Sequence, residues 1–131
     1  MWYRMGMERV ASVVAIVDDD DSVRRALRRL VTSLSHQSRT FASGEEFLDA
    51  LYEATPDCVL LDLNMPGLKG LDVLHRLRNE GRQVPAIIMT GFDQHGMRER
   101  CLEAGAAAYL VKPLGRAAVA SAIEEATAAS E

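Results

Sequence analysis

Short apolar segments alternate with longer amphipathic segments along almost the whole chain. Five of the short segments are rich in apolar and β-branched residues and predict strands at residues 12–17, 38–41, 58–61, 86–89 and 108–111. The first, third and fourth are nearly continuous in apolar residues, which is typical of strands covered on both faces. This alternation indicates βαβ units that build a parallel sheet.

The segments between the first strands carry apolar residues at helical spacing. Between residues 23 and 34 the apolar side chains recur every three or four positions, which predicts a first helix. Its opposite face carries Arg24, Arg25, Arg28 and Arg29. Ser43, with Glu46 three residues later, predicts a capping box that opens a second helix carrying Phe47, Leu48 and Leu51.

Three more helices are expected in the second half of the chain. Leu71, Leu74 and Leu77 predict a third helix that ends near Gly81. A fourth helix contains Met97, Cys101 and Leu102 and is closed by Gly105, and an alanine-rich fifth covers residues 116–127. The order predicts an α/β fold of the (βα)₅ type, a doubly wound, flavodoxin-like arrangement with a five-stranded parallel sheet. Residues 1–10 are expected to be a lead-in and residues 11–131 a single domain.

Composition supports one soluble domain. The 131 residues are 48% hydrophobic and 26% charged, with a formal net charge of −4, which disfavours direct binding to nucleic acid. No apolar run approaches the roughly 20 residues of a membrane helix. Four aspartates follow the apolar run at 11–17 where a signal peptide would have small residues, so we expect a cytoplasmic location. Cys58 and Cys101 lie in apolar stretches and are expected to be buried free thiols.

Polar residues follow four of the five predicted strands at the carboxyl ends, where open α/β sheets bind ligands. They are Asp18, Asp19, Asp20 and Asp21 after the first strand, Asp62 and Asn64 after the third, Thr90 after the fourth, and Lys112 with Pro113 after the fifth. Each has a structural explanation by itself, and Asp20 and Asp21 are best explained as the cap and first turn of the next helix. Their joint appearance on successive strand ends favours a functional site.

Clustered carboxylates require compensation, because two like charges 4 Å apart repel by about 4 kcal/mol at an effective dielectric near 20. Mg²⁺ prefers an oxygen-rich set such as Asp18, Asp19, Asp62 and the carbonyl of Asn64, and Mn²⁺ could substitute. Lys112 would add a second positive charge. Thr90 and Lys112 are residue types that stabilise a phosphoryl group in transfer, and an ionised Asp62 can be the nucleophile that forms an acyl phosphate.

Four motifs carry a resemblance to a known family. Ile16-Val17-Asp18-Asp19-Asp20, the segment from Leu60 to Gly67 (LLDLNMPG), Met89-Thr90-Gly91 and Val111-Lys112-Pro113 resemble the response regulator receiver domain of two-component signal transduction, in the CheY-like superfamily. The resemblance covers about residues 11–128. Ser22-Val23-Arg24 and residues 41–48 look most like the FixJ-type branch, whose receivers often precede a helix-turn-helix domain.

The resemblance implies a role for each matching residue. Asp62 would accept a phosphoryl group from the phosphohistidine of a sensor histidine kinase or phosphotransfer protein. Asp19, Asp62 and the Asn64 carbonyl would bind Mg²⁺ directly, and Asp18 would do so through water. Thr90 and Lys112 would contact the phosphoryl group, and the Lys112–Pro113 peptide bond would be cis. The domain would catalyse only its own phosphorylation and dephosphorylation, so it is a signalling domain and not an enzyme.

The family also has a switch and two tuning positions. Tyr109 falls on the aromatic switch position that moves inward with Thr90, or else is a partly buried edge-strand aromatic. Asn64 and Phe92 fall on the positions that tune the lifetime of the phosphorylated state. Because Phe92 can exclude water but not orient it, we expect a state that is not among the shortest-lived. The family uses one surface to dimerise or to engage a partner or output domain, and transcription is one such output. Here this surface would be formed by the fourth helix, the fifth strand and the fifth helix, with Arg98, Arg100, Tyr109 and Arg116.

Other functions remain to be weighed against this one. A flavodoxin-like carrier of flavin mononucleotide needs a loop without four aspartates after the first strand, and an aspartyl phosphatase would carry an acid where Asn64 stands. The main alternative is a receiver-like binding module that works without phosphorylation. The arginines of the first helix are either a docking surface for a kinase or a solvated face. The kinase, the output, and whether the receiver stands alone or belongs to a longer regulator are open.

Overall fold

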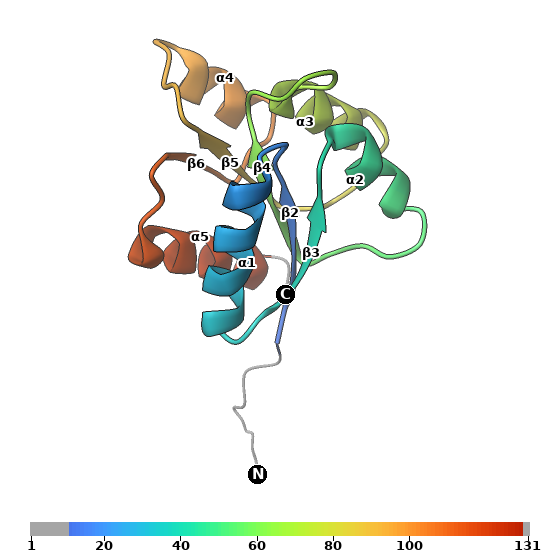
Figure 1. Ribbon diagram of the computed structural model, residues 1–131. Coiled ribbons are helices and arrows are strands. Elements are labelled where there is room, and N and C mark those ends of the chain that lie inside the picture. The colour runs from blue at the N-terminus through green and yellow to red at the C-terminus, as the bar shows by residue number, and fades with distance from the viewer. Residues whose placement is uncertain (1–10, 130–131) are drawn as a thin grey trace.

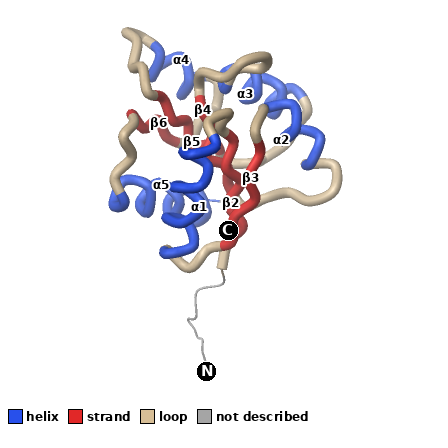
Figure 2. Tube along the Cα trace, in the orientation of Figure 1, coloured by secondary structure: helices blue, strands red, loops and turns tan. Residues whose placement is uncertain are grey.

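A single parallel sheet forms the centre of the molecule. The computed structural model describes residues 11–129, so the predicted lead-in at 1–10 lies outside the described residues. In this part of the chain five strands form one sheet in the order β3-β2-β4-β5-β6 (Figures 1 and 2). The strands are β2 (Val13–Val17), β3 (Gln37–Phe41), β4 (Cys58–Asp62), β5 (Ala86–Thr90) and β6 (Ala108–Val111). Every neighbouring pair is parallel, which confirms the predicted (βα)₅ fold.

Helices cover both faces of this sheet (Figure 1). They are α1 (Asp21–Ser33), α2 (Gly44–Ala50), α3 (Gly70–Asn79), α4 (Met97–Glu103) and α5 (Arg116–Ala129). Residues of α1 and α5 form one apolar cluster with one face of the sheet, and residues of α2, α3 and α4 form a second cluster with the other face. Successive residues of a strand point to opposite faces, so Ile16 and Leu60 join the first cluster while Val17 and Leu61 join the second.

The central strands are buried on both faces, as their continuous apolar sequences predict. All five residues of β4 and of β5 are buried. Each of these strands extends one residue beyond its predicted end, so Asp62 and Thr90 belong to the strands. The prediction stopped at the last apolar residue, whereas backbone pairing continues through the polar one. The sheet ladder therefore holds both polar residues in place.

Two helix starts show how local sequence sets the helix bounds. Asp20 caps α1 and accepts a hydrogen bond from the Ser22 amide, as predicted. Ser43 Oγ accepts from the Glu46 amide at the start of α2. The Glu46 carboxylate, however, accepts from the amide of Ala42 instead of that of Ser43, so the predicted capping box is displaced by one residue.

Other predictions for the helices are confirmed or corrected in detail. Cys58 and Cys101 are free and buried. Leu102 does not share the core face of α4, because its neighbour Cys101 takes that position and leaves Leu102 40% exposed. The third helix ends at Asn79, two residues before Gly81, whose φ of +68° suits glycine in the turn that follows. None of the helices described within residues 11–129 combines the length and apolar character that a membrane crossing requires.

Candidate functional site

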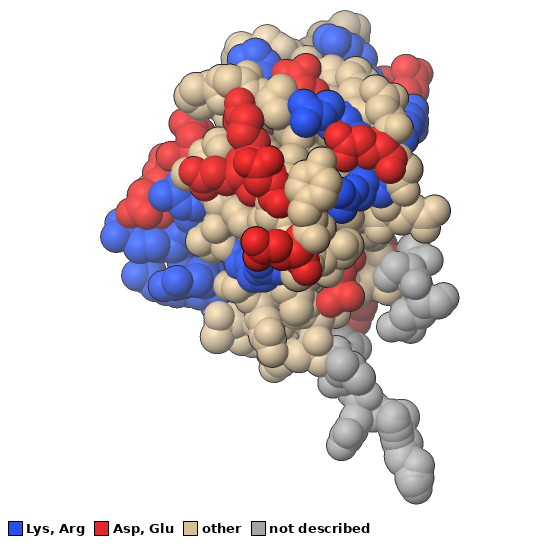
Figure 3. All heavy atoms as spheres, turned by 90° about the vertical axis from the view of Figure 1, so that its right-hand side faces the viewer, with Lys and Arg blue, Asp and Glu red and all other residues tan. Residues whose placement is uncertain are grey.

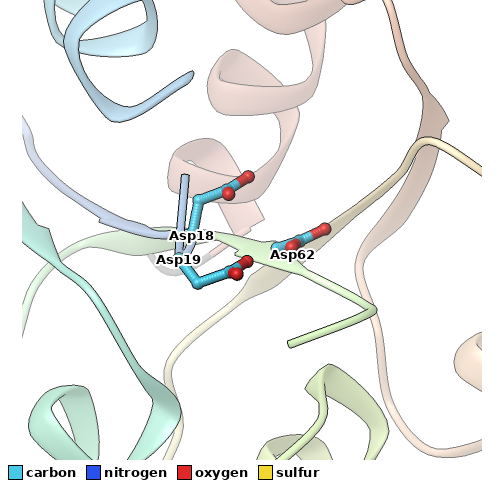
Figure 4. A group of neighbouring side chains, drawn as sticks. All are labelled: Asp18, Asp19 and Asp62. Atoms are coloured by element: carbon cyan, nitrogen blue, oxygen red, sulfur yellow. The ribbon is translucent and has the colours of Figure 1, made fainter. Parts of the chain in front are cut away.

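Three carboxylates meet at the carboxyl edge of the sheet. Asp18 and Asp19 follow β2, and Asp62 is the last residue of β4, which pairs with β2. Each offers a ligand oxygen, and these atoms lie within 4.8 Å of one another (Figure 4). Asp18 is 1% and Asp62 4% exposed, whereas Asp19 is exposed. The parallel sheet thus brings together acids that lie more than forty residues apart in the sequence.

Lys112 contacts two of these carboxylates. Its Nζ atom lies 2.8 Å from Asp18 Oδ2 and 3.4 Å from Asp62 Oδ1. Burial lowers the pKa of Lys112, but the hydrogen bond to Asp18 and the charges of both carboxylates outweigh it and raise the pKa above its ordinary value. Lys112 follows β6, at the far end of the sheet from β2, and its long side chain reaches back to the acids.

The electrostatics of Asp62 show that Lys112 does not fully compensate the cluster. Burial first, and then the charge of Asp18, raise the pKa of Asp62 to about 6, against the lowering effect of Lys112. Three carboxylates beside one ammonium group favour a further cation. The donor set is made of oxygen atoms, partly buried and partly open through Asp19, and it fits Mg²⁺, which takes one or two carboxylates and retains waters. The Asn64 carbonyl as an additional ligand stays a prediction.

Thr90 is the last residue of β5, the strand that pairs with β4. It is fully buried, and its hydroxyl donates to the Phe92 carbonyl at 3.0 Å. The same oxygen accepts from the Phe92 amide at 3.1 Å and from Asn64 Nδ2 at 3.3 Å. The hydroxyl thus connects the loop that follows β5 to the loop that follows β4.

Tyr109 and Phe92 take different positions relative to the core. Tyr109 is 5% exposed and more buried than the partly buried alternative, and its hydroxyl donates to Asp93 Oδ1 at 2.8 Å. Burial, and next the Asp93 hydrogen bond, raise the pKa of Tyr109 to about 12. The Arg98 guanidinium lies over the ring, 5.9 Å from its centroid. Phe92 is 66% exposed, so exclusion of water by its ring stays a prediction.

Two contacts near the site are not predicted by the sequence. Asp93 accepts the Tyr109 hydroxyl, and an acid in the loop after β5 was the available signal. The arginines of the first helix are predicted to be either a docking surface or a solvated face. Neither alternative includes the contact of Arg24, whose guanidinium turns back and donates to the Asp18 carbonyl at 2.7 Å. The peptide bond between Lys112 and Pro113 is cis, the isomer that the resemblance implies.

Comparison with known proteins gives the family. The family model of the response regulator receiver domain matches the sequence of residues 14–124. The response regulator protein TmoT of Ectopseudomonas mendocina is 36% identical over 110 residues, which cover 84% of this chain and 50% of TmoT. The DNA-binding transcriptional regulator NtrC of Klebsiella pneumoniae is 42% identical over 98 residues, which cover 75% of this chain and 21% of NtrC. This chain therefore spans half or less of the length of these relatives.

Solved structures agree with the sequence relatives. The crystal structure of FixJ-N superposes with a TM-score of 0.85 at 28% identity, covering 92% of this chain and 96% of that one. The response regulator StyR superposes with a TM-score of 0.79 at 31% identity, covering 91% and 61%. Together with the family match over the acidic edge, these likenesses show that the chain belongs to the response regulator receiver domain family of two-component signalling proteins.

Proposed function

We propose that this chain is a phosphoacceptor switch, in which Asp62 takes a phosphoryl group from the phosphohistidine of a partner histidine kinase or phosphotransfer protein in a Mg²⁺-dependent reaction. One observation carries the proposal. The Asp62 carboxylate is buried beside two other carboxylates, yet Lys112 is the single cation within 4 Å of it among the described residues. A divalent cation would complete such a site electrostatically, and its charge together with that of Lys112 would favour a phosphoryl group on Asp62.

Asp19 and Asp62, with the Asn64 carbonyl, would hold Mg²⁺ directly, and Asp18 would hold it through water. When bound, Mg²⁺ supplies positive charge to the phosphoryl oxygens. In the transfer, an Asp62 carboxylate oxygen bonds to phosphorus while the bond from phosphorus to the histidine nitrogen breaks, and the nitrogen keeps the electron pair. Lys112 Nζ and the Thr90 hydroxyl then contact the phosphoryl oxygens. Attack by water later returns Asp62 and inorganic phosphate.

The signal leaves the site through Thr90 and Tyr109. The Thr90 hydroxyl is hydrogen-bonded to the loop after β5, and the Tyr109 hydroxyl is hydrogen-bonded to Asp93 in the same loop. Movement of this loop would change the surface formed by α4, β6 and α5, where Leu102 and Val111 are 40% and 46% exposed. We place a partner, an output domain or a second copy of the chain on this surface.

Direct contact with nucleic acid is not part of the proposal for these residues. The chain carries a net charge of −4. On the face that carries α2 and α3, acidic side chains gather over the middle, and basic ones lie at the lower left and also at the top and right of the middle (Figure 3). NtrC is named as DNA-binding, but the match covers 21% of it. We therefore place any transcriptional output outside residues 11–129, and the exchange with the kinase in the cytoplasm.

The test is the intact mass of the protein after incubation with Mg²⁺ and acetyl phosphate. We expect the wild type to gain about 80 Da, the mass of one phosphoryl group on an aspartyl nucleophile. The Asp62→Asn variant should gain nothing, and chelation of Mg²⁺ should abolish the gain in the wild type. No gain in the wild type, or an equal gain in the variant, would favour a binding module that works without phosphorylation.

A further inference from the structure

The Arg24 side chain turns back toward the acidic site, whereas a surface arginine would extend into solvent. Its side chain is 18% exposed, whereas that of the neighbouring Arg25 is 61% exposed. Arg24 Nη1 donates to the Asp18 carbonyl at 2.7 Å, and Nη2 lies 3.1 Å from Asp21 Oδ1. The side chain thus connects the first turn of α1 to Asp18, the first residue after β2.

With the contact of Arg24, every polar atom of Asp18 has a hydrogen-bond partner. The Asp18 amide donates to the Phe41 carbonyl at 3.2 Å, its Oδ1 accepts from the Asp20 amide at 2.9 Å, and its Oδ2 accepts from Lys112. The remaining polar atom is the carbonyl oxygen, and Arg24 is its partner. All four polar atoms of this buried aspartate are therefore held, two of them by long cationic side chains that come from α1 and from the residue after β6.

The position of the Asp19 side chain depends on how these hydrogen bonds hold Asp18. Its carboxylate is exposed, and its place among the three ligand oxygens follows from the backbone that Asp18 begins. The peptide that joins Asp18 to Asp19 contains the carbonyl that Arg24 binds. A bond to this carbonyl restricts rotation of the peptide, and rotation of the peptide would move the Asp19 side chain.

We infer that Arg24 is a positioning residue for the divalent-cation site: it holds the peptide between Asp18 and Asp19 so that the Asp19 carboxylate faces Asp62. The inference rests on the proposed function, because it assigns Arg24 to the Mg²⁺ site of that function. Partners that orient metal ligands typically contribute tenfold or more to metal affinity.

The sign of the effect separates positioning from charge. Arg24 is a cation near a cation site, so its removal would strengthen Mg²⁺ binding if only electrostatics mattered. Loss of positioning weakens binding instead. Arg28, on the same helix and exposed, provides the matched control for removal of a positive charge.

The experiment measures the free energy of unfolding in urea over a series of Mg²⁺ concentrations, since the Mg²⁺-dependent increment gives the dissociation constant. The variants are Arg24→Met, which keeps most of the aliphatic stem, Arg24→Lys, which keeps a donor of similar reach, and Arg28→Met. Hydrogen exchange of the Asp20 amide without metal provides a second readout.

We expect Arg24→Met to weaken Mg²⁺ binding by about tenfold and to speed exchange at Asp20. Arg24→Lys should recover part of the affinity, and Arg28→Met should bind as the wild type does. Equal or tighter binding by Arg24→Met, or a loss of stability that is the same at all Mg²⁺ concentrations, would overturn the inference and leave the proposed function standing. If the stability of the wild type does not change with Mg²⁺ concentration, both this inference and the proposed function are overturned.

Discussion

Replacing Asp62 with Asn is expected to stabilise the metal-free domain at neutral pH. Asp62 is 4% exposed. Burial, with the charge of Asp18, raises its pKa from 3.8 to about 6. Below pH 3.8 the carboxyl group is protonated in the folded and the unfolded chain and costs nothing. As the pH rises through this interval the unfolded chain ionises first, so the stability of the wild type falls, and above about pH 6 the loss is complete.

The size of the effect follows from the shift. A difference of about 2 pKa units corresponds to about 3 kcal/mol at 1.36 kcal/mol per unit. The site lies at the edge of the sheet and is open through Asp19, so solvent screening reduces this value. We therefore expect Asp62→Asn to gain between about 1 and 3 kcal/mol above pH 7. Lys112 keeps its closer partner, Asp18, in the variant.

The assay is urea unfolding followed by circular dichroism between pH 4.5 and 8 in the presence of a chelator. The gap between variant and wild type should grow with pH and level off near pH 7. Asp49→Asn, an exposed carboxylate on α2, is the matched control and should show no such growth. Added Mg²⁺ should narrow the gap by stabilising the wild type. A variant that is no more stable than the wild type at pH 7.5 without metal would refute the reasoning.

Three further substitutions test other parts of the structure. A Cβ on Gly70 would lie 2.6 Å from the Asp62 carbonyl oxygen, so Gly70→Ala should cost about 1–3 kcal/mol in urea unfolding, while Gly115→Ala, with open space around it, should be nearly neutral. Ser43→Ala removes the cap of α2 and should cost about 1 kcal/mol by the same assay, and an unchanged midpoint would contradict the capping assignment. Tyr109→Phe removes the hydrogen bond to Asp93 and should cost about 0.5–1.5 kcal/mol; losses of stability that simply add in the Asp93→Ala, Tyr109→Phe double variant would argue against that bond.

The architecture and the acidic edge could be predicted because they depend on periodicity and chain order. Continuous apolar runs identified β4 and β5, and parallel strands necessarily bring their carboxyl ends to one edge. Asp18, Asp62 and Lys112 therefore meet, although they are far apart in sequence.

The contacts of long and loop-borne side chains could not be predicted in the same way. Arg24 has the helical position of a surface residue, but its flexible side chain reaches a carbonyl in the preceding loop. Asp93 lies in a loop whose course depends on the helix that follows, so its meeting with Tyr109 needs the tertiary structure. Glu46 shows the same limit on a smaller scale, since spacing predicts a cap but not which amide the carboxylate binds.

The Thr90 hydroxyl has one hydrogen atom, and in this structure it is committed to the carbonyl of Phe92. An acceptor on Asp62 that takes this hydrogen leaves the carbonyl without it, so the two bonds exclude each other. Thermodynamic linkage makes this effect reciprocal. If a partner binds better to the loop released by Thr90, the partner raises the affinity of the site for the ligand on Asp62, and the ligand raises the affinity for the partner by the same factor. In this molecule, communication between the buried site and the loop after β5 can therefore be as short as the transfer of one hydrogen bond.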